Sequence, residues 1–217
     1  MDSILEPLVE SPRLNNYLAE LEIIALKERI KRMEFYNSLN EDSNAEFING
    51  NIVMHSPVTR IHSIVSDSTF HLLSTFCKLN NLGEVHHEKV MISLTRNDYE
   101  PDLCFFSKLK AKEFDDEMLL FPAPNLIVEI LSKSTEDVDW GVKFEDYASH
   151  GINEYWIIDP RKKILEQYFL DKEQYHLQFK GKSGTVKSRS IKNLQFTVKA
   201  IFDENENLKT IQRWMKK

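Results

Sequence analysis

One acidic residue, Glu129, lies inside the nearly continuous apolar run 126–131. Such a run is typical of a strand that is covered on both faces. In a strand, the Glu129 side chain would share one face with Ile127 and Leu131. A buried carboxylate without a partner costs several kcal/mol. We therefore expect Glu129 to be neutralised, paired with a lysine or bound to a cation.

A second acid, Asp102, begins another predicted strand earlier in the chain. If the two strands are neighbours, the carboxylates of Asp102 and Glu129 reach one point. Two oxygen donors of this kind suit Mg²⁺, which keeps several waters and typically takes one or two carboxylates. A structural pair between Glu129 and a lysine is the simpler alternative, and the spacing leaves both open.

A positive charge, Lys143, follows on the helix that is predicted after Glu129, four residues beyond Asp139. A pair with this spacing usually lies on the surface and contributes a few tenths of a kcal/mol. Alternatively, Lys143 reaches the acidic ends of the strands. There an ammonium group would orient or deprotonate a water and stabilise the charge that develops on a phosphate. The spacing does not decide between the two.

Length and composition limit the classes of protein to consider. With 217 residues, 41% of them apolar and 29% charged, the chain suits one sizeable core with an appendage. No segment approaches the roughly 20 apolar residues of a membrane helix, and no secretory signal is visible. Two cysteines make no disulfide framework, so we expect a cytoplasmic protein without membrane partners. Cys77 with His86 and His87 lacks the ligand spacing of a zinc site.

Charge is distributed unevenly along the chain. The 28 Lys and Arg against 34 Asp and Glu give a formal net charge of -6, which opposes a simple electrostatic attraction to nucleic acid. Residues 174–202, in contrast, hold six basic residues and no acid. The ordinary explanation is a solvated hairpin face. The functional one is a surface that contacts a nucleic-acid backbone outside a catalytic cleft.

The hydrophobic pattern predicts an α/β fold with a mixed sheet flanked by helices. Residues 1–44 form a predicted helical extension, whose apolar positions at 17–26 would pack on the same domain or on a second subunit. Asn49-Gly50 between two short apolar runs predicts a β-hairpin. Ile61–Phe76 has the pattern of an amphipathic helix.

The second half of the chain adds three expectations. Residues 108–124 carry charges and two prolines, which favour an irregular loop. A helix follows the Glu129 strand, opened by a near capping box at Ser134 and Asp137 and closed by Gly151. After a short buried strand, two further runs predict an antiparallel extension of the sheet at the C-terminal side.

An ordered set of motifs runs through most of the sequence: Glu46–Pro57, His62, Pro101–Asp102, Ile127–Thr135, Asp139, Lys143, Tyr147 and Gly151–Pro160. This set resembles the Uma-type (Uma-two) restriction endonucleases, a branch of the PD-(D/E)xK nuclease superfamily. The resemblance covers about residues 45–202 and leaves the N-terminal helix outside. It implies a restriction-endonuclease-like domain over residues 45–217. It also implies an endonuclease that hydrolyses phosphodiester bonds of DNA with Mg²⁺ or Mn²⁺.

The resemblance also implies roles for particular residues. Asp102 takes the place of the family's PD aspartate and Glu129 that of its second acid, both as metal ligands. The superfamily's short motif has a catalytic lysine where this sequence has Leu131, and the migrated lysine is Lys143. Asp139 would orient this lysine.

Two further polar positions match the branch. Glu46 would be an outer metal ligand, and His62 would transfer a proton or contact a phosphate. The simpler explanation for His62 is that it caps or lines its helix.

Two expectations concern the protein as a whole. The apolar residues 17–26 and the need to cut two strands together predict a homodimer. The alternative to an enzyme is a nuclease fold that no longer cuts and binds nucleic acid or a protein partner. Buried acids and a helix lysine argue against that alternative, because a site without function has no reason to keep buried charge.

Overall fold

The computed structural model of the protein describes residues 5–40 and 43–216. The helices are α1 (Glu6–Val9), α2 (Leu14–Ser38), α3 (Arg60–Asn80), α4 (Lys108–Ala111), α5 (Glu136–Trp140), α6 (Val142–Ser149), α7 (Lys199–Phe202) and α8 (Glu204–Met215). The strands are β1 (Ala45–Ile48), β2 (Asn51–Met54), β3 (Gly83–His87), β4 (Met91–Ser93), β5 (Asp98–Tyr99), β6 (Leu103–Ser107), β7 (Leu120–Phe121), β8 (Leu126–Ile130), β9 (Glu154–Asp159), β10 (Ile164–Asp171), β11 (Gln174–Gly181), β12 (Thr185–Lys187) and β13 (Gln195–Thr197). Within these ranges, no helix has the length and apolar character needed to cross a bilayer.

A six-stranded mixed sheet forms the centre of the molecule, with the strand order β11-β10-β9-β8-β6-β3. β8 and β9 run parallel, and every other neighbouring pair in this sheet is antiparallel. The parallel pair is connected by α5 and α6, because parallel neighbours need a crossover rather than a hairpin. β10 and β11 extend the sheet antiparallel to β9, which confirms the predicted C-terminal extension.

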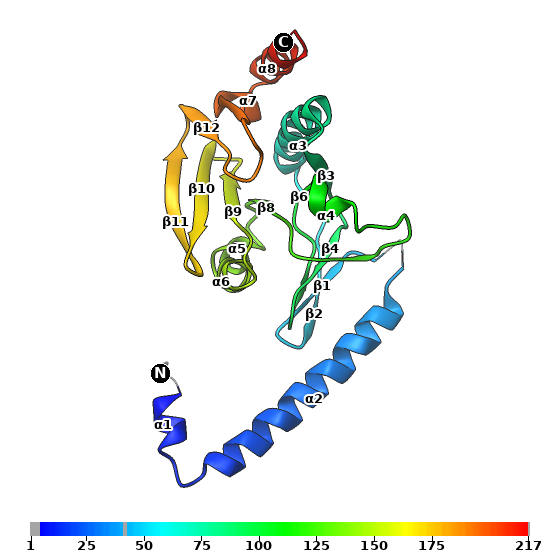
Figure 1. The fold of residues 1–217 in the computed structure, drawn as a ribbon, viewed down its shortest axis with the longest axis vertical. Coiled ribbons are helices and arrows are strands. Elements are labelled where there is room, and N and C mark those ends of the chain that lie inside the picture. Colours follow the sequence, from blue (N-terminus) through cyan, green and yellow to red (C-terminus); the bar gives the residue numbers. More distant parts are fainter. Residues whose placement is uncertain (1–4, 41–42, 217) are drawn as a thin grey trace.

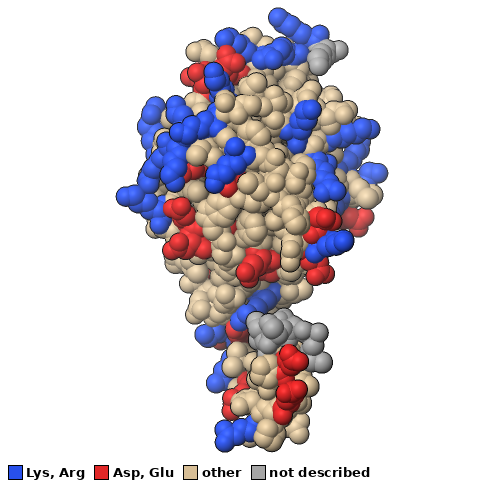
Figure 2. All heavy atoms as spheres, turned by 90° about the vertical axis from the view of Figure 1, so that its left-hand side faces the viewer, with Lys and Arg blue, Asp and Glu red and all other residues tan. Residues whose placement is uncertain are grey.

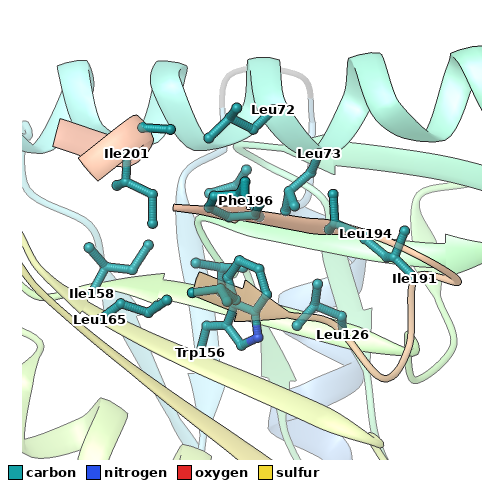
Figure 3. Close-up of a cluster of buried hydrophobic side chains, with 14 of the residues drawn as sticks. Leu72, Leu73, Leu126, Trp156, Ile158, Leu165, Ile191, Leu194, Phe196 and Ile201 are labelled. Carbon is teal, nitrogen blue, oxygen red and sulfur yellow. The ribbon is translucent and has the colours of Figure 1, made fainter. Parts of the chain in front are cut away.

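The core lies on both faces of this sheet, as the continuous apolar run of β8 predicts. Leu126 and Val128 of β8 point into the cluster that α3, α7 and β13 cover, and Figure 3 shows the side chains of this cluster interdigitating below α3. Ile127 points to the opposite face, where α6 packs. The Glu129 side chain therefore lies on the Ile127 face, as the alternation predicts.

A second sheet, with the order β2-β1-β5-β4-β7, lies beside the first. Asn49 (φ 48°) and Gly50 (φ 76°) make the two-residue turn of the β1–β2 hairpin, with Ile48 paired to Asn51. The predicted hairpin is thus confirmed. β1 is fully buried and carries Glu46 towards the first sheet, whereas β2 is an exposed edge strand.

The long helix α2 is attached to the body through its C-terminal half, where Glu28 pairs with Arg96 at 2.7 Å. Phe35 is buried, and the Arg32 guanidinium donates to both carboxylate oxygens of Asp98 at 2.7 Å. The earlier part of α2 projects away from the body (Figure 1), and its apolar side chains, such as Leu21 and Ile24, are about half exposed. The predicted helix is present, but its apolar residues do not pack on this chain.

Three local predictions are wrong. Residues 108–124 are not one irregular loop, because they contain α4 and also β7, which pairs parallel with β4. The capping box at Ser134 does not form: α5 begins at Glu136, and the Ser134 hydroxyl contacts the Ser132 hydroxyl at 3.0 Å instead. The helix predicted up to Gly151 is also interrupted, as two shorter helices.

Candidate active site

The two strand acids meet because β6 and β8 are antiparallel neighbours. Asp102 stands just before β6, opposite Glu129 near the end of β8. The backbone N–H of Asp102 donates to Glu129 Oε2 (3.4 Å), and the N–H of Ile130 donates to Asp102 Oδ2 (2.6 Å). Both acids line a cavity of about 320 Å³. The structure therefore has the strand adjacency that the sequence left open.

Lys143 points from α6 into a group of buried carboxylates. Its Nζ lies 2.9 Å from Glu46 Oε1, 3.1 Å from Glu129 Oε1 and 3.5 Å from Asp139 Oδ1. All four side chains are at most 4% exposed. Lys143 and Asp139 thus do not form a surface pair. The lysine is buried, and it connects α6 to β1, β8 and α5 through its three carboxylate neighbours.

Gly141 makes this arrangement possible by separating α5 from α6. Its backbone (φ -104°, ψ -107°) is not helical, and a Cβ added there would lie 2.6 Å from the carbonyl oxygen of Asp137. Only glycine fits so close to that carbonyl without a shift of the backbone. The interruption sets the directions of Asp139 before it and Lys143 after it.

Burial and neighbouring charges oppose one another at this cluster. For Glu129, burial raises the pKa well above its usual value, Lys143 lowers it, and Asp139 raises it further. For Lys143, burial works against the charged form, but Glu129, Glu46 and Asp139 outweigh burial and raise the pKa well above its usual value. Lys143 is consequently an ammonium ion held by carboxylates.

Negative charge exceeds positive charge around Lys143. Burial raises the pKa of Asp139 to about 6 against the opposing effect of Lys143. Burial and then Glu46 raise the pKa of Glu100, which lines the same cavity, to about 7. Among the described residues, no hydrogen bond reaches the buried oxygens Asp139 Oδ1 and Glu100 Oε2. Asp139 Oδ1 has the 3.5 Å ion pair with Lys143, and Glu100 Oε2 has His55 Nε2 at 3.8 Å, so each oxygen keeps lone pairs that a water or a cation would satisfy.

His62 comes from α3 on the other side of the cavity and is 6% exposed. Its Nε2 lies 3.3 Å from Asp102 Oδ1. Burial lowers the pKa of this imidazole, but the hydrogen bond and charge of Asp102 outweigh burial, and the net shift is upward. His62 therefore lines the cavity wall, and most of its side chain is buried.

Three groups at the site were not among the predicted site residues. The Tyr147 hydroxyl donates to Glu129 Oε1 at 3.0 Å. The His55 Nε2 atom lies 3.8 Å from both Glu46 Oε2 and Glu100 Oε2. Tyr147 and His55 belong to the motifs of the resemblance, but nothing in the sequence pointed to Glu100 beyond its place two residues before Asp102.

The donor set fits a hard divalent cation. Within residues 5–40 and 43–216, no three or more His, Cys, Asp or Glu side chains are grouped so that they could hold a metal ion. Asp102 and Glu129, which backbone N–H groups hold at the cavity wall, would contact an ion there, and water would complete its shell, as is common for Mg²⁺. The excess of buried carboxylates over the single lysine that contacts them supports that fit.

Comparisons with known proteins identify the family of the chain. The family model "Uma2: Putative restriction endonuclease" matches residues 28–199. The chain belongs to this family. The Uma2 match begins inside α2 rather than near Ala45, so the attached end of α2 is part of the family's region. No curated protein matches the chain.

A solved structure supports the Uma2 fold. The crystal structure of a "putative nuclease belonging to DUF820" from Anabaena variabilis ATCC 29413 is 18% identical, with a TM-score of 0.67. The similarity covers 78% of this chain and 95% of that one. The restriction-endonuclease-like class, a mixed sheet flanked by helices, is therefore confirmed, and the Uma2 family describes the chain as a nuclease in general terms.

Proposed function

We propose that the protein is a metal-dependent endonuclease that hydrolyses phosphodiester bonds of DNA. One observation carries the proposal: Lys143 Nζ lies within 3.1 Å of both Glu46 and Glu129, beside Asp102, in a cavity lined by these residues. Two sheet acids and a helix lysine are the groups that phosphodiester hydrolysis needs for charge stabilisation. The family description supports nucleic acid as the substrate.

Asp102 and Glu129 would hold Mg²⁺ or Mn²⁺. Glu46 would not contact the ion, and it would influence the two ligands by holding Lys143 beside them. When bound, the ion supplies Lewis-acid polarisation of the phosphate and an activated nucleophile at neutral pH. Backbone N–H groups already hold the carboxylates of Asp102 and Glu129 in place. Binding an ion would therefore require little rearrangement of these two side chains.

Lys143 would act as a cation and not as a base. Its raised pKa keeps the ammonium group charged, so of the two roles that the sequence left open, orienting a water is favoured over deprotonating it. The ammonium donates hydrogen bonds towards the attacking oxygen or the phosphate. Asp139 and Glu46 keep its position by holding it from two directions.

His62 would contact the scissile phosphate or give a proton to the leaving oxygen. Asp102 raises the pKa of His62, which increases its protonated fraction near neutral pH. A protonated imidazole at the cavity wall has both the charge and the proton that these roles require.

The direct test is cleavage of plasmid and oligonucleotide DNA with Mg²⁺ or Mn²⁺ by the wild type, Asp102→Asn and Glu129→Gln. We expect each variant to lose about 10²–10³-fold in rate, because each removes charge aimed at the reacting phosphate. Glu84→Gln is the matched control, since Glu84 is an exposed carboxylate that pairs with His86 at 3.1 Å. A Glu129→Gln variant that cleaves DNA at the wild-type rate would contradict the proposed site.

Metal binding gives a second, independent measurement. An ion that binds only the folded protein stabilises it by about 2.7 kcal/mol at about 100 times its Kd. We expect Mg²⁺ or Mn²⁺ to raise the melting temperature of the wild type and of Glu84→Gln but not of Glu129→Gln. A wild type that ignores the cations and leaves all DNA intact would favour the rival reading, a nuclease fold that only binds nucleic acid or a protein.

We also propose that two copies associate through α2. Its projecting part exposes apolar side chains all around the helix, and a second copy would cover them: Leu18, Leu21, Ile23, Ile24, Leu26, Ile30 and Met33. Charge favours antiparallel pairing of two α2 helices. Glu20 and Glu22 lie in the N-terminal half, and Lys27 and Arg29 lie in the C-terminal half.

Light scattering of the protein as it elutes from a size-exclusion column tests this dimer. We expect the wild type to be a dimer at micromolar concentration and Ile24→Glu to be a monomer, because a charge at the centre of the contact would be buried without a partner. Leu177→Glu is the control, since Leu177 of β11 is equally exposed but lies outside α2. A monomeric wild type would contradict the proposal.

A further inference from the structure

A second hollow adjoins the candidate active site. Its volume is about 460 Å³, and seven residues line it: Arg161, Lys162, Lys163, Lys182, Lys199, Phe202 and Asp203. Five of the seven carry a positive charge. The single acid of the lining, Asp203, already accepts the backbone N–H of Glu206 at 3.0 Å as the N-cap of α8. The hollow is therefore a concentration of positive charge in a protein whose formal net charge is -6.

Most of these cations are not used by the fold. Lys162 pairs with Asp159 at 3.1 Å. In the part of the chain that the structure describes, the other four basic residues of the lining have no carboxylate within salt-bridge distance: Arg161, Lys163, Lys182 and Lys199. All four side chains are exposed. Positive charges that stabilise nothing internally are available to an anionic ligand.

The turn that carries three of the cations is fixed in shape. Asp159 Oδ1 accepts the backbone N–H groups of Arg161 at 2.9 Å and Lys162 at 2.8 Å. Lys163 has a positive φ of 55°, which closes the turn between β9 and β10. A turn held in this way presents its side chains at set positions, so less conformational entropy is lost on binding.

The hollow and the catalytic cavity share a wall. Arg161 lines both, and Pro160 beside it lines the cavity that contains Glu129. Figure 2 views the molecule from the side of β11 and β12, and Lys and Arg side chains gather over the upper part of this face. Basic charge thus continues from the edge of the candidate active site onto the outer surface of the β-extension.

We propose that this basic hollow binds backbone phosphates of the same DNA strand whose scissile phosphate lies in the cavity, a few nucleotides away. The inference rests on the proposed function. Lysine is a point charge that suits a phosphate without a fixed geometry, and four of the hollow's five basic residues are lysines, which contact phosphates without reading base edges. The hollow therefore contributes affinity and strand register, and it carries no sequence preference.

The test is the binding of a fluorescein-labelled DNA duplex, followed by anisotropy in Ca²⁺ at several salt concentrations. The double variant Lys182→Ala/Lys199→Ala removes two cations from the hollow and touches nothing in the cavity. We expect binding on the order of tenfold weaker at low salt and a salt dependence about two units shallower in log Kd against log salt. The charge reversal Lys182→Glu/Lys199→Glu should weaken binding further.

The matched control is Lys108→Ala/Lys112→Ala, which removes two exposed lysines that line neither the hollow nor the cavity. An equal loss in the control, or an unchanged Kd and slope in the hollow variant of a protein that binds and cuts the duplex, would overturn this inference alone. A wild type that neither binds nor cuts the duplex would overturn the hollow and the proposed function together.

Discussion

Two buried glutamates on the neighbouring parallel strands β8 and β9 have opposite surroundings. Glu129 on β8 faces a cavity, one lysine and several other carboxylates. Glu154 on β9 is fully buried and accepts five hydrogen bonds of 2.7–2.9 Å, from Trp156 Nε1, Gln167 Nε2, Ser188 Oγ, Arg189 N and Ser190 N. Every donor to Glu154 is neutral, and no other charge lies in that group.

The difference distinguishes a buried carboxylate with a structural role from one that is available for chemistry. A carboxylate whose lone pairs are all satisfied by neutral donors holds elements together, because its own charge has nothing left to act on. Glu129 is held less completely, and burial, followed by repulsion from Asp139 and Asp102, raises its pKa against the opposing effect of Lys143. Such a perturbed acid in a cavity is typical of a functional site. Burial alone therefore does not identify the acid that does the chemistry.

The largest effect is expected from removing the one cation of the Glu129 cluster. Lys143→Met leaves Glu46, Glu129 and Asp139 buried without a counter-charge, so we expect a loss of about 3–5 kcal/mol in the free energy of unfolding. Urea unfolding measures it. Lys209→Met, an exposed i,i+3 lysine, is the control. Equal stabilities of the two variants would mean that the carboxylates do not depend on Lys143.

The same substitution at the two glutamates sharpens the comparison. Glu154→Gln brings an NH₂ group against five donors, so we expect a loss of about 2–3 kcal/mol in stability and an unchanged cleavage rate per folded molecule. Glu129→Gln should cost less than about 1 kcal/mol, because it removes one of several repelling carboxylates, and should slow cleavage by about 10²–10³-fold. Calorimetry and cleavage assays on both variants give the result; a reversed pattern would refute the division of roles.

Gly141 tests how the Glu129 cluster is positioned. Gly141→Ala places a Cβ 2.6 Å from the Asp137 carbonyl oxygen, so the junction between α5 and α6 must shift. We expect about 1–3 kcal/mol of destabilisation, in the range of overpacked sites. Because Asp139 and Lys143 lie on either side of the junction, cleavage should fall as well. Gly151→Ala is the comparison: an added Cβ meets nothing within 4 Å, but the positive φ of 71° makes the substitution cost stability through backbone strain, and its cleavage rate per folded molecule should stay unchanged. Equal cleavage by both variants would show that the junction does not position the site.

The smallest effect is expected at Tyr147. Tyr147→Phe removes the hydroxyl that donates to Glu129 Oε1 at 3.0 Å and leaves the packed ring in place. A single net hydrogen bond contributes about 1 kcal/mol, somewhat more to a charged acceptor. Thermal unfolding should show that loss together with a weaker response to Mg²⁺. Unchanged metal affinity would mean that Tyr147 does not orient the carboxylate.

The sequence predicts those parts of the site that depend on local pattern. Alternation along β8 places Glu129 on the correct face, and Asn49-Gly50 predicts the hairpin that carries Glu46. The interruption at Gly141 was missed, because it depends on a close contact with a carbonyl and not on apolar periodicity. β7 was missed for a similar reason, since a two-residue strand exists only through its pairing with β4.

Such local patterns do not predict contacts between residues that are far apart in the sequence. Three of the five donors to Glu154 come from residues 188–190, more than thirty positions along the chain, and the sequence near Glu154 does not predict them. The roles of Asp102, Glu129, Lys143, Glu46 and His62 came from the family resemblance. The sheets bring the three acids together, α6 and α3 add Lys143 and His62, and the roles of all five in catalysis stay a prediction.

The bonds to Glu154 set a limit on trimming the protein. A fragment that stops before Ser188 would strand a fully buried anion inside β9 with three of its five donors missing. The sequence motifs of the candidate active site end near Pro160. The part of the chain up to Pro160 is nevertheless not a separable unit. Any minimal version made for expression or fusion has to run past residue 190, whereas the projecting start of α2 can be shortened without opening this core.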